Sequence, residues 1–224
     1  YDISMDNIRA LLFPLHITAF CLCDALEERN YEGASQVIII SASSKTAIGL
    51  AQGLAEKKDT PKIVGLTSKN NTQFVKNLDC YDEVISYDSL KDLGNELSVM
   101  VDMSGNQLIL SSLQKFLGNK MLKCLTVGMT HWDKSSTAEE ALAQAELQER
   151  TEFFFAPTHI QKRYNDWGKK GYNEKTTIFM NARAKQSLNW MTIKEISGLD
   201  NFVQTYEEIV SGNINPNEGI VVLL

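Results

Sequence analysis

The sequence predicts an α/β protein with a doubly wound, mostly parallel sheet of six strands and a C-terminal extension. The first observation is the run of β-branched residues from Val37 to Ile40, which is typical of a parallel strand buried on both faces. The second is the small polar loop 41–44, which leads directly into helical spacing. The third is the alternation of apolar strands and helices over residues 37–157, which predicts right-handed crossovers. This pattern is that of a Rossmann sheet.

The elements follow one another at regular spacing. The first helix, 8–30, is apolar in its middle and helical on either side of Pro14. Further helices are expected at 44–57, 70–79, 107–118, 135–152 and 199–211, and strands at 37–40, 61–68, 82–88, 98–105, 120–129, 152–157 and 219–224. The polar, basic and aromatic segment after Pro157 is predicted to be a loop or a short-helix excursion. The final strand has no obvious partner, so we divide the chain into a Rossmann-type domain at 1–157 and an extension at 158–224.

Composition argues against several kinds of partner. The chain has 224 residues, a net charge of −6, a hydrophobic share of 43% and a charged share of 22%, as in an ordinary soluble globular protein. The acidic balance disfavours nucleic acid, whose phosphates require a basic face. We find no uninterrupted apolar stretch of membrane-spanning length and no signal peptide, so we expect a cytoplasmic protein with no membrane partner. The four cysteines lack metal-type spacing and are interpreted as core residues; no zinc ligand set is visible.

The loop after the first strand is the candidate phosphate site. The dinucleotide fingerprint G-x-G-x-x-G falls on Ala42, Ser44 and Ala47, which are small but are not glycine. The loop hydroxyl groups are suited to capping the helix or to donating to a pyrophosphate. A P-loop ending at 44–46 would place its first glycine at Ile39, inside the buried strand, which argues against a triphosphate site. A capped turn without a ligand is the alternative.

The end of the second strand bears on which nicotinamide cofactor is preferred. NAD-binding sheets place an acidic residue there, about 20 positions after the fingerprint, to hold the ribose hydroxyls. In this sequence the positions hold Thr67, Ser68, Lys69, Asn70 and Asn71, with no acid among them. Hydroxyls, amides and a lysine suit a 2′-phosphate better, which favours NADP(H) and leaves NAD(H) open. Alternatively, these residues form a polar turn that only caps the next helix.

Several motifs occur in the order and spacing of a known family. They are TAF at 18–20, the strand and loop at 37–49, LDCYDEVISYD at 78–88, VDMSG at 101–105 and LTVGM at 125–129. With them the chain resembles the cofactor-binding domain of the medium-chain dehydrogenases/reductases, above all the zinc-free, quinone-oxidoreductase-like members. The pieces SASSKTAIGLA, GLTS, CYD, FFAP, KR and DWG are closer still to an uncharacterised family called domain of unknown function 2855. The resemblance covers most of residues 15–157 well and the remainder loosely.

The resemblance implies which residues line a dinucleotide site. It places the pyrophosphate beside Ser43, Ser44, Lys45 and Thr46, the adenosine ribose and its phosphate beside Thr67, Ser68, Lys69 and Tyr87, and the nicotinamide beside Ser104, Gly105, Gly128 and Met129. The lysine that such reductases often carry in the second helix corresponds to Thr72, so the preference for NADP over NAD stays open. In the family the final helix and strand return to a separate N-terminal catalytic domain, which we expect a chain beginning at Tyr1 to lack.

Candidates for proton transfer and for association are fewer. His131 is the local candidate for a proton donor, with a surface-loop histidine as the alternative. His16, on an apolar helix face, is expected to be a core residue. The run from Phe153 to Phe155 on an edge strand is an association risk for a monomer, so we predict a homodimer there. One polar group is a candidate for binding an anionic substrate, with a solvated loop as the alternative: His159, Lys162, Arg163, Asp166 and Trp167.

These features predict an NADP(H)-dependent oxidoreductase acting on a small-molecule substrate. The reaction would transfer a hydride between the nicotinamide and a carbonyl or an activated alkene, as in a quinone or enone. The alternative is a non-catalytic dinucleotide-sensing or interaction module, which the loss of all three fingerprint glycines favours. A third interpretation is a methyltransferase built on a similar sheet, which S-adenosylmethionine would stabilise.

Overall fold

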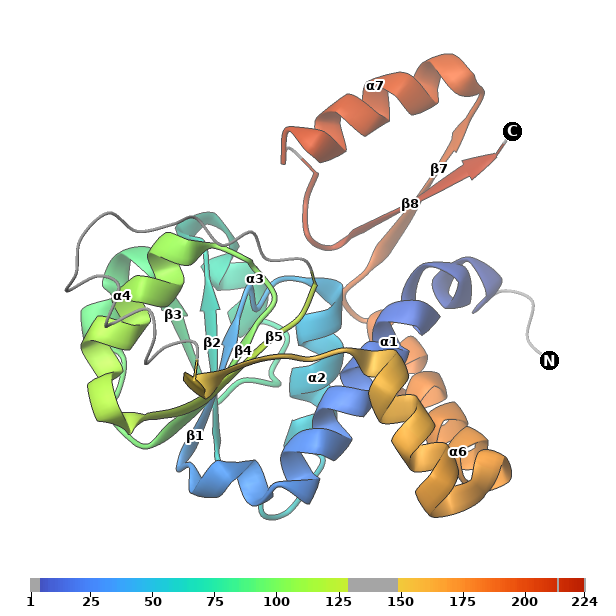
Figure 1. Ribbon diagram of the computed structural model, residues 1–224. Helices are drawn as coiled ribbons and strands as arrows, with labels where there is room; N and C mark the ends of the chain where they lie inside the picture. Colours follow the sequence, from blue (N-terminus) through green and yellow to red (C-terminus); the bar gives the residue numbers. More distant parts are fainter. Residues whose placement is uncertain (1–4, 129–148, 213, 224) are drawn as a thin grey trace.

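In the computed structural model, which describes residues 5–128, 149–212 and 214–223, six strands form one parallel sheet (Figure 1). Their order in space is β3-β2-β1-β4-β5-β6, and each neighbouring pair is parallel. The strands are β1 (Gln36–Ile40), β2 (Lys62–Thr67), β3 (Glu83–Ser86), β4 (Ser98–Asp102), β5 (Met121–Thr126) and β6 (Thr151–Phe153). The predicted doubly wound Rossmann-like sheet is thereby confirmed.

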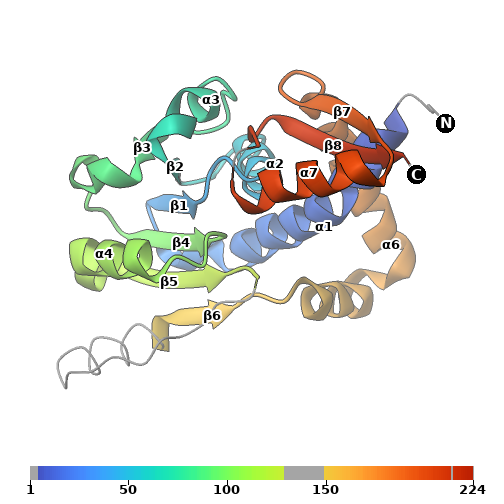
Figure 2. The same cartoon turned by 90° about the horizontal axis from the view of Figure 1, so that it is seen from above.

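Helices cover both faces of this sheet. On one face, α1 (Asp6–Glu28) and α2 (Lys45–Ala55) pack against Val37 and Ile39 of β1, and on the other α4 (Gln107–Leu117) packs beneath Ile38 and Ile40. Figure 2 shows α2 and α4 on opposite sides of the strands. Because alternate side chains of β1 enter two different cores, the strand is apolar at each of these four positions. The remaining connections carry α3 (Thr72–Lys76) and the 3₁₀ turns η2 (Asn30–Gly33), η3 (Lys69–Asn71), η4 (Tyr87–Asp92) and η5 (Gly118–Lys120).

The leading helix α1 runs through Pro14 without ending there. Within the described ranges it is the one helix long and apolar enough, by length and composition, to cross a membrane, with a mean hydropathy of 1.5. It packs against α2 and against α6 (Ala156–Ser187), and 50% of its most apolar window is buried inside the protein. Its apolar character is therefore accounted for by its place in the core.

The segment after Pro157 is helical, so the predicted loop is wrong and the alternative, a short-helix excursion, is closer to the structure. α6 consists of two helices that meet at a kink at Gly168, whose φ of 70° and ψ of 162° are not helical. The ring of Phe20 on α1 meets three aromatic rings of α6 edge-on, at centroid distances of 5.5 to 6.5 Å. These three are Trp167, Tyr172 and Phe179. They are widely spaced among polar residues, and this spacing hides the helical period in the sequence.

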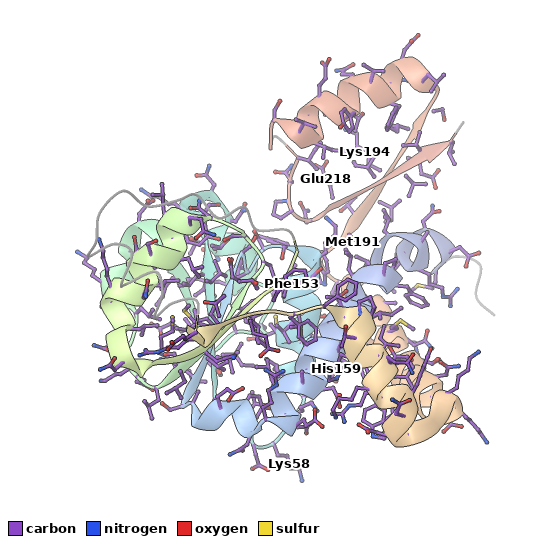
Figure 3. All side chains as sticks on the ribbon, in the orientation of Figure 1. Lys58, Phe153, His159, Met191, Lys194 and Glu218 are labelled. Atoms are coloured by element: carbon purple, nitrogen blue, oxygen red, sulfur yellow. The ribbon has the colours of Figure 1, made fainter. Side chains whose placement is uncertain are left out.

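The final strand has a partner within the chain. β8 (Glu218–Leu223) pairs in parallel with β7 (Thr192–Ser197), and α7 (Leu199–Val210) connects the two. We call β7, α7 and β8 the C-terminal unit. It stands apart from the large sheet and joins the rest of the chain near Met191 (Figures 1 and 3). Met191 packs with Met5, Ile8 and Leu12 of the N-terminal segment, whereas α7 exposes Leu199, Val203, Tyr206, Ile209 and Val210.

Two other predicted elements differ from the structure or fall outside it. The sixth strand ends at Phe153, and Phe155 is the N-cap of α6, so the predicted strand 152–157 is too long. Pro157 stands in the first turn of α6, where its missing N–H leaves no hydrogen bond unmade. The helix predicted at 135–152 lies almost wholly outside the described residues.

Gly53 tests the packing of α2 between α1 and α6. A methyl group there would lie 2.6 Å from a ring carbon of Phe179 and 2.7 Å from Sγ of Cys23. We expect Gly53→Ala to lower the free energy of unfolding in urea by about 1–2 kcal/mol, because overpacking outweighs the gain in helix propensity. Gly171→Ala is the matched control, since the one contact of its methyl among the described residues would be Cβ of Trp167, at 3.3 Å. A Gly53→Ala variant as stable as this control would contradict the packing.

Candidate functional site

The candidate site lies where the chain changes direction across the sheet. β1 and β4 are adjacent and parallel, and the helices that follow them, α2 and α4, cover opposite faces. At such a switch point the two loops diverge, and in open α/β sheets ligands bind in the resulting crevice at the carboxyl ends of the strands. The loops to consider therefore follow β1, β2, β4 and β5.

The turn after β1 adopts a conformation that residues other than glycine rarely take. Ser41 has a φ of 66°, in the left-handed region, and its N–H donates to the hydroxyl oxygen of Tyr87 at 3.0 Å. The N–H of Ala42 donates to the carbonyl of Leu66, and the hydroxyl of Tyr81 donates to the carbonyl of Ala42, both at 2.9 Å. The turn is therefore fixed to β2 and to the segments on either side of β3.

Gly65 on β2 provides the room that the first fingerprint position needs. A methyl group on Gly65 would lie 3.0 Å from Cβ of Ala42 and 2.9 Å from the ring of Tyr81. In the usual fingerprint the glycines stand in the loop and at the helix start. Here an alanine stands in the loop and a glycine in the neighbouring strand, while Ala47 at the third position is fully buried. The loop thus approaches β2 closely without a glycine of its own.

The start of α2 faces the same edge of the sheet. Ser44 is its N-cap, and its hydroxyl oxygen accepts the N–H of Ala47 at 3.4 Å. Lys45 and Thr46 open the first turn, which contains no acidic residue. Because the first N–H groups of a helix lack intrahelical acceptors and the helix dipole is positive there, this end favours an anion.

The end of β2 contacts the loop after β1. The hydroxyl oxygen of Ser43 accepts hydrogen bonds from Oγ1 of Thr67 at 3.3 Å and from Nδ2 of Asn71 at 3.1 Å. Thr67 is buried, Ser68 is half-buried, and Lys69 is exposed at the start of η3. Lys69 also lines a groove of about 430 Å³ beside β3. The structure therefore brings Ser43 and Thr67 together and leaves Lys69 at the surface.

Asp102, the last residue of β4, is a site residue that the sequence analysis missed. It is 1% exposed, and its Oδ1 accepts both the N–H and the hydroxyl of Ser104, at 2.8 and 2.7 Å. Its Oδ2 is buried and has no hydrogen-bond partner in the part of the chain that the structure describes. Burial raises the pKa of Tyr87, and the carboxylate of Asp102 raises it further. The sequence signal that could have identified Asp102 is an acidic residue at the end of an apolar strand.

Lys45 reaches from α2 to the C-terminal unit. Its Nζ donates to the carbonyl of Pro216, in the turn before β8, at 3.1 Å. Burial lowers the pKa of this ammonium group, and the carboxylate of Glu218 opposes the shift.

Gly105 and Gly128, in the loops after β4 and β5, have positive φ values of 63° and 96°.

The remaining candidates lie away from this edge or outside the described residues. Met129 and His131 belong to the latter. On α6, Nε2 of His159 lies 2.6 Å from Oδ2 of Asp24 on α1, and the guanidinium group of Arg163 also binds Asp24 (Figure 3 labels His159). Lys162 and Arg163 both contact Glu28 and Asp166. The cations of this group therefore already have acidic partners, and they attach α6 to α1.

The buried histidine and thiols behave as core groups. His16 is 1% exposed, and burial, reinforced by Arg183, lowers its pKa to about 4. The four cysteines are buried and free, and burial raises the pKa of each thiol. Over residues 5–128, 149–212 and 214–223, no group of three His, Cys, Asp or Glu side chains could hold a metal ion.

The sequence profile of one family, described as protein of unknown function (DUF2855), matches residues 2–215. The chain belongs to the DUF2855 family. This confirms the resemblance inferred from the motifs of the loop and strands. A comparison of this DUF2855 chain with curated proteins finds no significant match.

The fold of this DUF2855 chain is similar to that of solved oxidoreductases. CurA from Vibrio vulnificus, in complex with NADPH, has a TM-score of 0.57 at 14% identity, over 84% of this chain and 56% of CurA. The yhdH oxidoreductase from Salmonella enterica, in complex with NADP, has a TM-score of 0.56 at 14% identity, over 93% of this chain and 60% of the oxidoreductase. Galactitol-1-phosphate dehydrogenase from Escherichia coli has a TM-score of 0.55 at 12% identity, over 92% of this chain and 57% of the dehydrogenase. The likeness is one of fold, and the chain spans less than two thirds of each of these proteins.

The left-handed turn at Ser41 can be tested by substitution. A β-branched side chain is strongly disfavoured at positive φ, so Ser41→Val should lower the free energy of unfolding by about 1–2 kcal/mol. Ser41→Gly, the matched control, should leave stability unchanged or raise it by up to about 1 kcal/mol. Urea denaturation of the three proteins measures both effects. Equal stability of the valine and glycine variants would show that the turn is not left-handed.

Proposed function

We propose that the chain binds NADP(H) across the carboxyl ends of β1 and β4. The observation that carries this proposal is the start of α2, which is capped by Ser44, contains no acid in its first turn and lies at the switch point of the sheet. Pyrophosphate oxygens would accept hydrogen bonds from the N–H groups of Lys45 and Thr46. The CurA and yhdH structures, which share the fold, are complexes with NADPH and NADP.

The residues after β2 support the phosphorylated cofactor. Ser68 and Lys69 occupy the position where an acid would hold the free ribose hydroxyls of NAD. Lys69 is exposed, so its ammonium group can turn toward a 2′-phosphate without leaving a buried partner unpaired. Tyr87 lies nearby in the fold, with its hydroxyl oxygen on the Ser41 amide.

The proposed reaction is hydride transfer between the nicotinamide and a carbonyl or activated alkene of a quinone-like or enone-like substrate. The bound cofactor would supply the hydride chemistry, and the chain would position it. Gly105 and Gly128 would border the nicotinamide side, and among the described residues none lies within 4 Å of a methyl group added at Gly128. His131 remains our candidate for the proton donor to the substrate oxygen.

A second candidate function rests on the hydrogen bonds inside the loop. The hydroxyl oxygen of Ser43 already accepts two hydrogen bonds, and that of Ser44 caps α2. A loop satisfied in this way suits a module that senses a dinucleotide without turning it over. The two functions differ in whether bound NADPH is oxidised when quinones or enones are added. Stabilisation by S-adenosylmethionine would point instead to a methyltransferase.

Isothermal titration calorimetry with NADPH and NADH tests the cofactor proposal. We expect NADPH to bind more tightly than NADH, and Lys69→Met to weaken NADPH binding by about fivefold, because it removes a surface charge partner of the 2′-phosphate. NADH binding should barely change. Lys170→Met, on the exposed face of α6, is the control and should leave both affinities unchanged. The absence of binding by either nucleotide at millimolar concentration would refute the proposal.

We also propose that the chain forms a homodimer through the edge of β6. Phe153 and Phe155 are 55% and 54% exposed, and their rings stack at a centroid distance of 6.2 Å (Figure 3 labels Phe153). β6 pairs only with β5 among the described strands, so its other edge offers backbone groups to a second copy.

Analytical ultracentrifugation tests this association. The wild-type chain should sediment as a dimer at micromolar concentration, and Phe153→Ser with Phe155→Ser should sediment as a monomer, because the apolar contact is lost. Leu108→Ser is the control, since Leu108 is 81% exposed and belongs to α4, not to the edge strand β6. A monomeric wild type would contradict the proposal, as would an unchanged dimer in the double variant.

A further inference from the structure

Lys45 belongs to two parts of the molecule at once. Its backbone opens the first turn of α2, and its Nζ donates to the carbonyl of Pro216 at 3.1 Å. The C-terminal unit also packs through Ile193 of β7 against the apolar cluster around Met191. A change in the charge near the start of α2 can therefore affect the turn before β8 through the side chain of Lys45.

The turn that presents Pro216 is itself well held. Nδ2 of Asn215 donates to a carboxylate oxygen of Glu218 at 2.8 Å, and the N–H of Glu218 donates to the carbonyl of Asn215 at 3.0 Å. The carbonyl of Asn217, the residue after Pro216, accepts the N–H of Thr192 at 2.9 Å, and this hydrogen bond attaches the turn to β7. The position of the Pro216 carbonyl is thus fixed by the C-terminal unit as a whole.

The charge of Lys45 is only partly compensated where it lies. The ammonium group is half-buried and has three donors, one of which goes to the neutral carbonyl of Pro216. It also sits at the positive end of the α2 dipole, where a cation is unfavourable and where the first turn has no acid. An anion at this end would relieve both effects.

Resting on the proposed function, we infer that Lys45 couples dinucleotide binding to the docking of the C-terminal unit. The ammonium group keeps its hydrogen bond to Pro216 and gives a second donor to the pyrophosphate. The anion balances the positive charge that burial and the helix dipole disfavour, so the ammonium group is held at this end of α2 beside the carbonyl. The docked unit in turn holds the long side chain in place, so that less of its conformational entropy is lost on binding. The coupling is reciprocal by linkage.

Hydrogen exchange at the amides of Thr192 and Glu218 measures this coupling, because both amides lie in the hydrogen bonds of the turn. Saturating NADPH should slow their exchange by about fivefold or more in the wild-type chain. Lys45→Met should abolish the slowing and weaken NADPH binding by roughly tenfold. Lys45→Arg, which keeps the charge, should retain part of both effects. Lys57→Met is the control, since Lys57 follows the other end of α2 and pairs with Glu27.

The outcomes separate this inference from the proposed function. If NADPH binds but leaves both amides unchanged, the coupling is refuted and the cofactor proposal stands. Equal slowing in wild type and Lys45→Met would refute the role of Lys45. Saturating inorganic pyrophosphate, the second probe, should reproduce the slowing, and a failure to do so would refute the phosphate as its cause. If NADPH does not bind at all, both proposals fall together.

Discussion

The candidate site depends on the close contact between the turn after β1 and the neighbouring strand β2. β1 is buried on both faces and must pass into α2 within a few residues, so the backbone has to turn sharply beside β2. Ser41 accepts the left-handed conformation, and Gly65 leaves room for the methyl group of Ala42. Without this contact, the start of α2 would not face the carboxyl ends of β1 and β4.

Hydrogen bonds from neighbouring segments hold this turn in place. Tyr87 and Tyr81 reach it from the segments around β3, and Thr67 and Asn71 reach Ser43 from the end of β2. These side chains thus fix the loop at the carboxyl end of β1. This arrangement explains how a loop that lacks all three fingerprint glycines keeps its tight turn from β1 into α2.

The sequence is sufficient for the large sheet and insufficient for the segments that pack around it. β1, β2 and β4 are buried on both faces, so their apolar runs identify them directly. α6 escapes prediction because it is held by scattered aromatic rings on Phe20 and by ion pairs with α1, neither of which produces a helical period. β7 escapes because its side chains are mostly exposed. Asp102 could have been found from the acid that ends an apolar strand, whereas the contact of Lys45 with Pro216 joins positions 171 residues apart, which a linear pattern does not reveal.

A crystal structure of the chain soaked with NADPH tests the account most directly. We expect the pyrophosphate at the start of α2, with its oxygens about 3 Å from the N–H groups of Lys45 and Thr46 and the nicotinamide toward the loops after β4 and β5. NADPH bound elsewhere on the molecule would contradict the account. An empty crevice at saturating NADPH would contradict it as well.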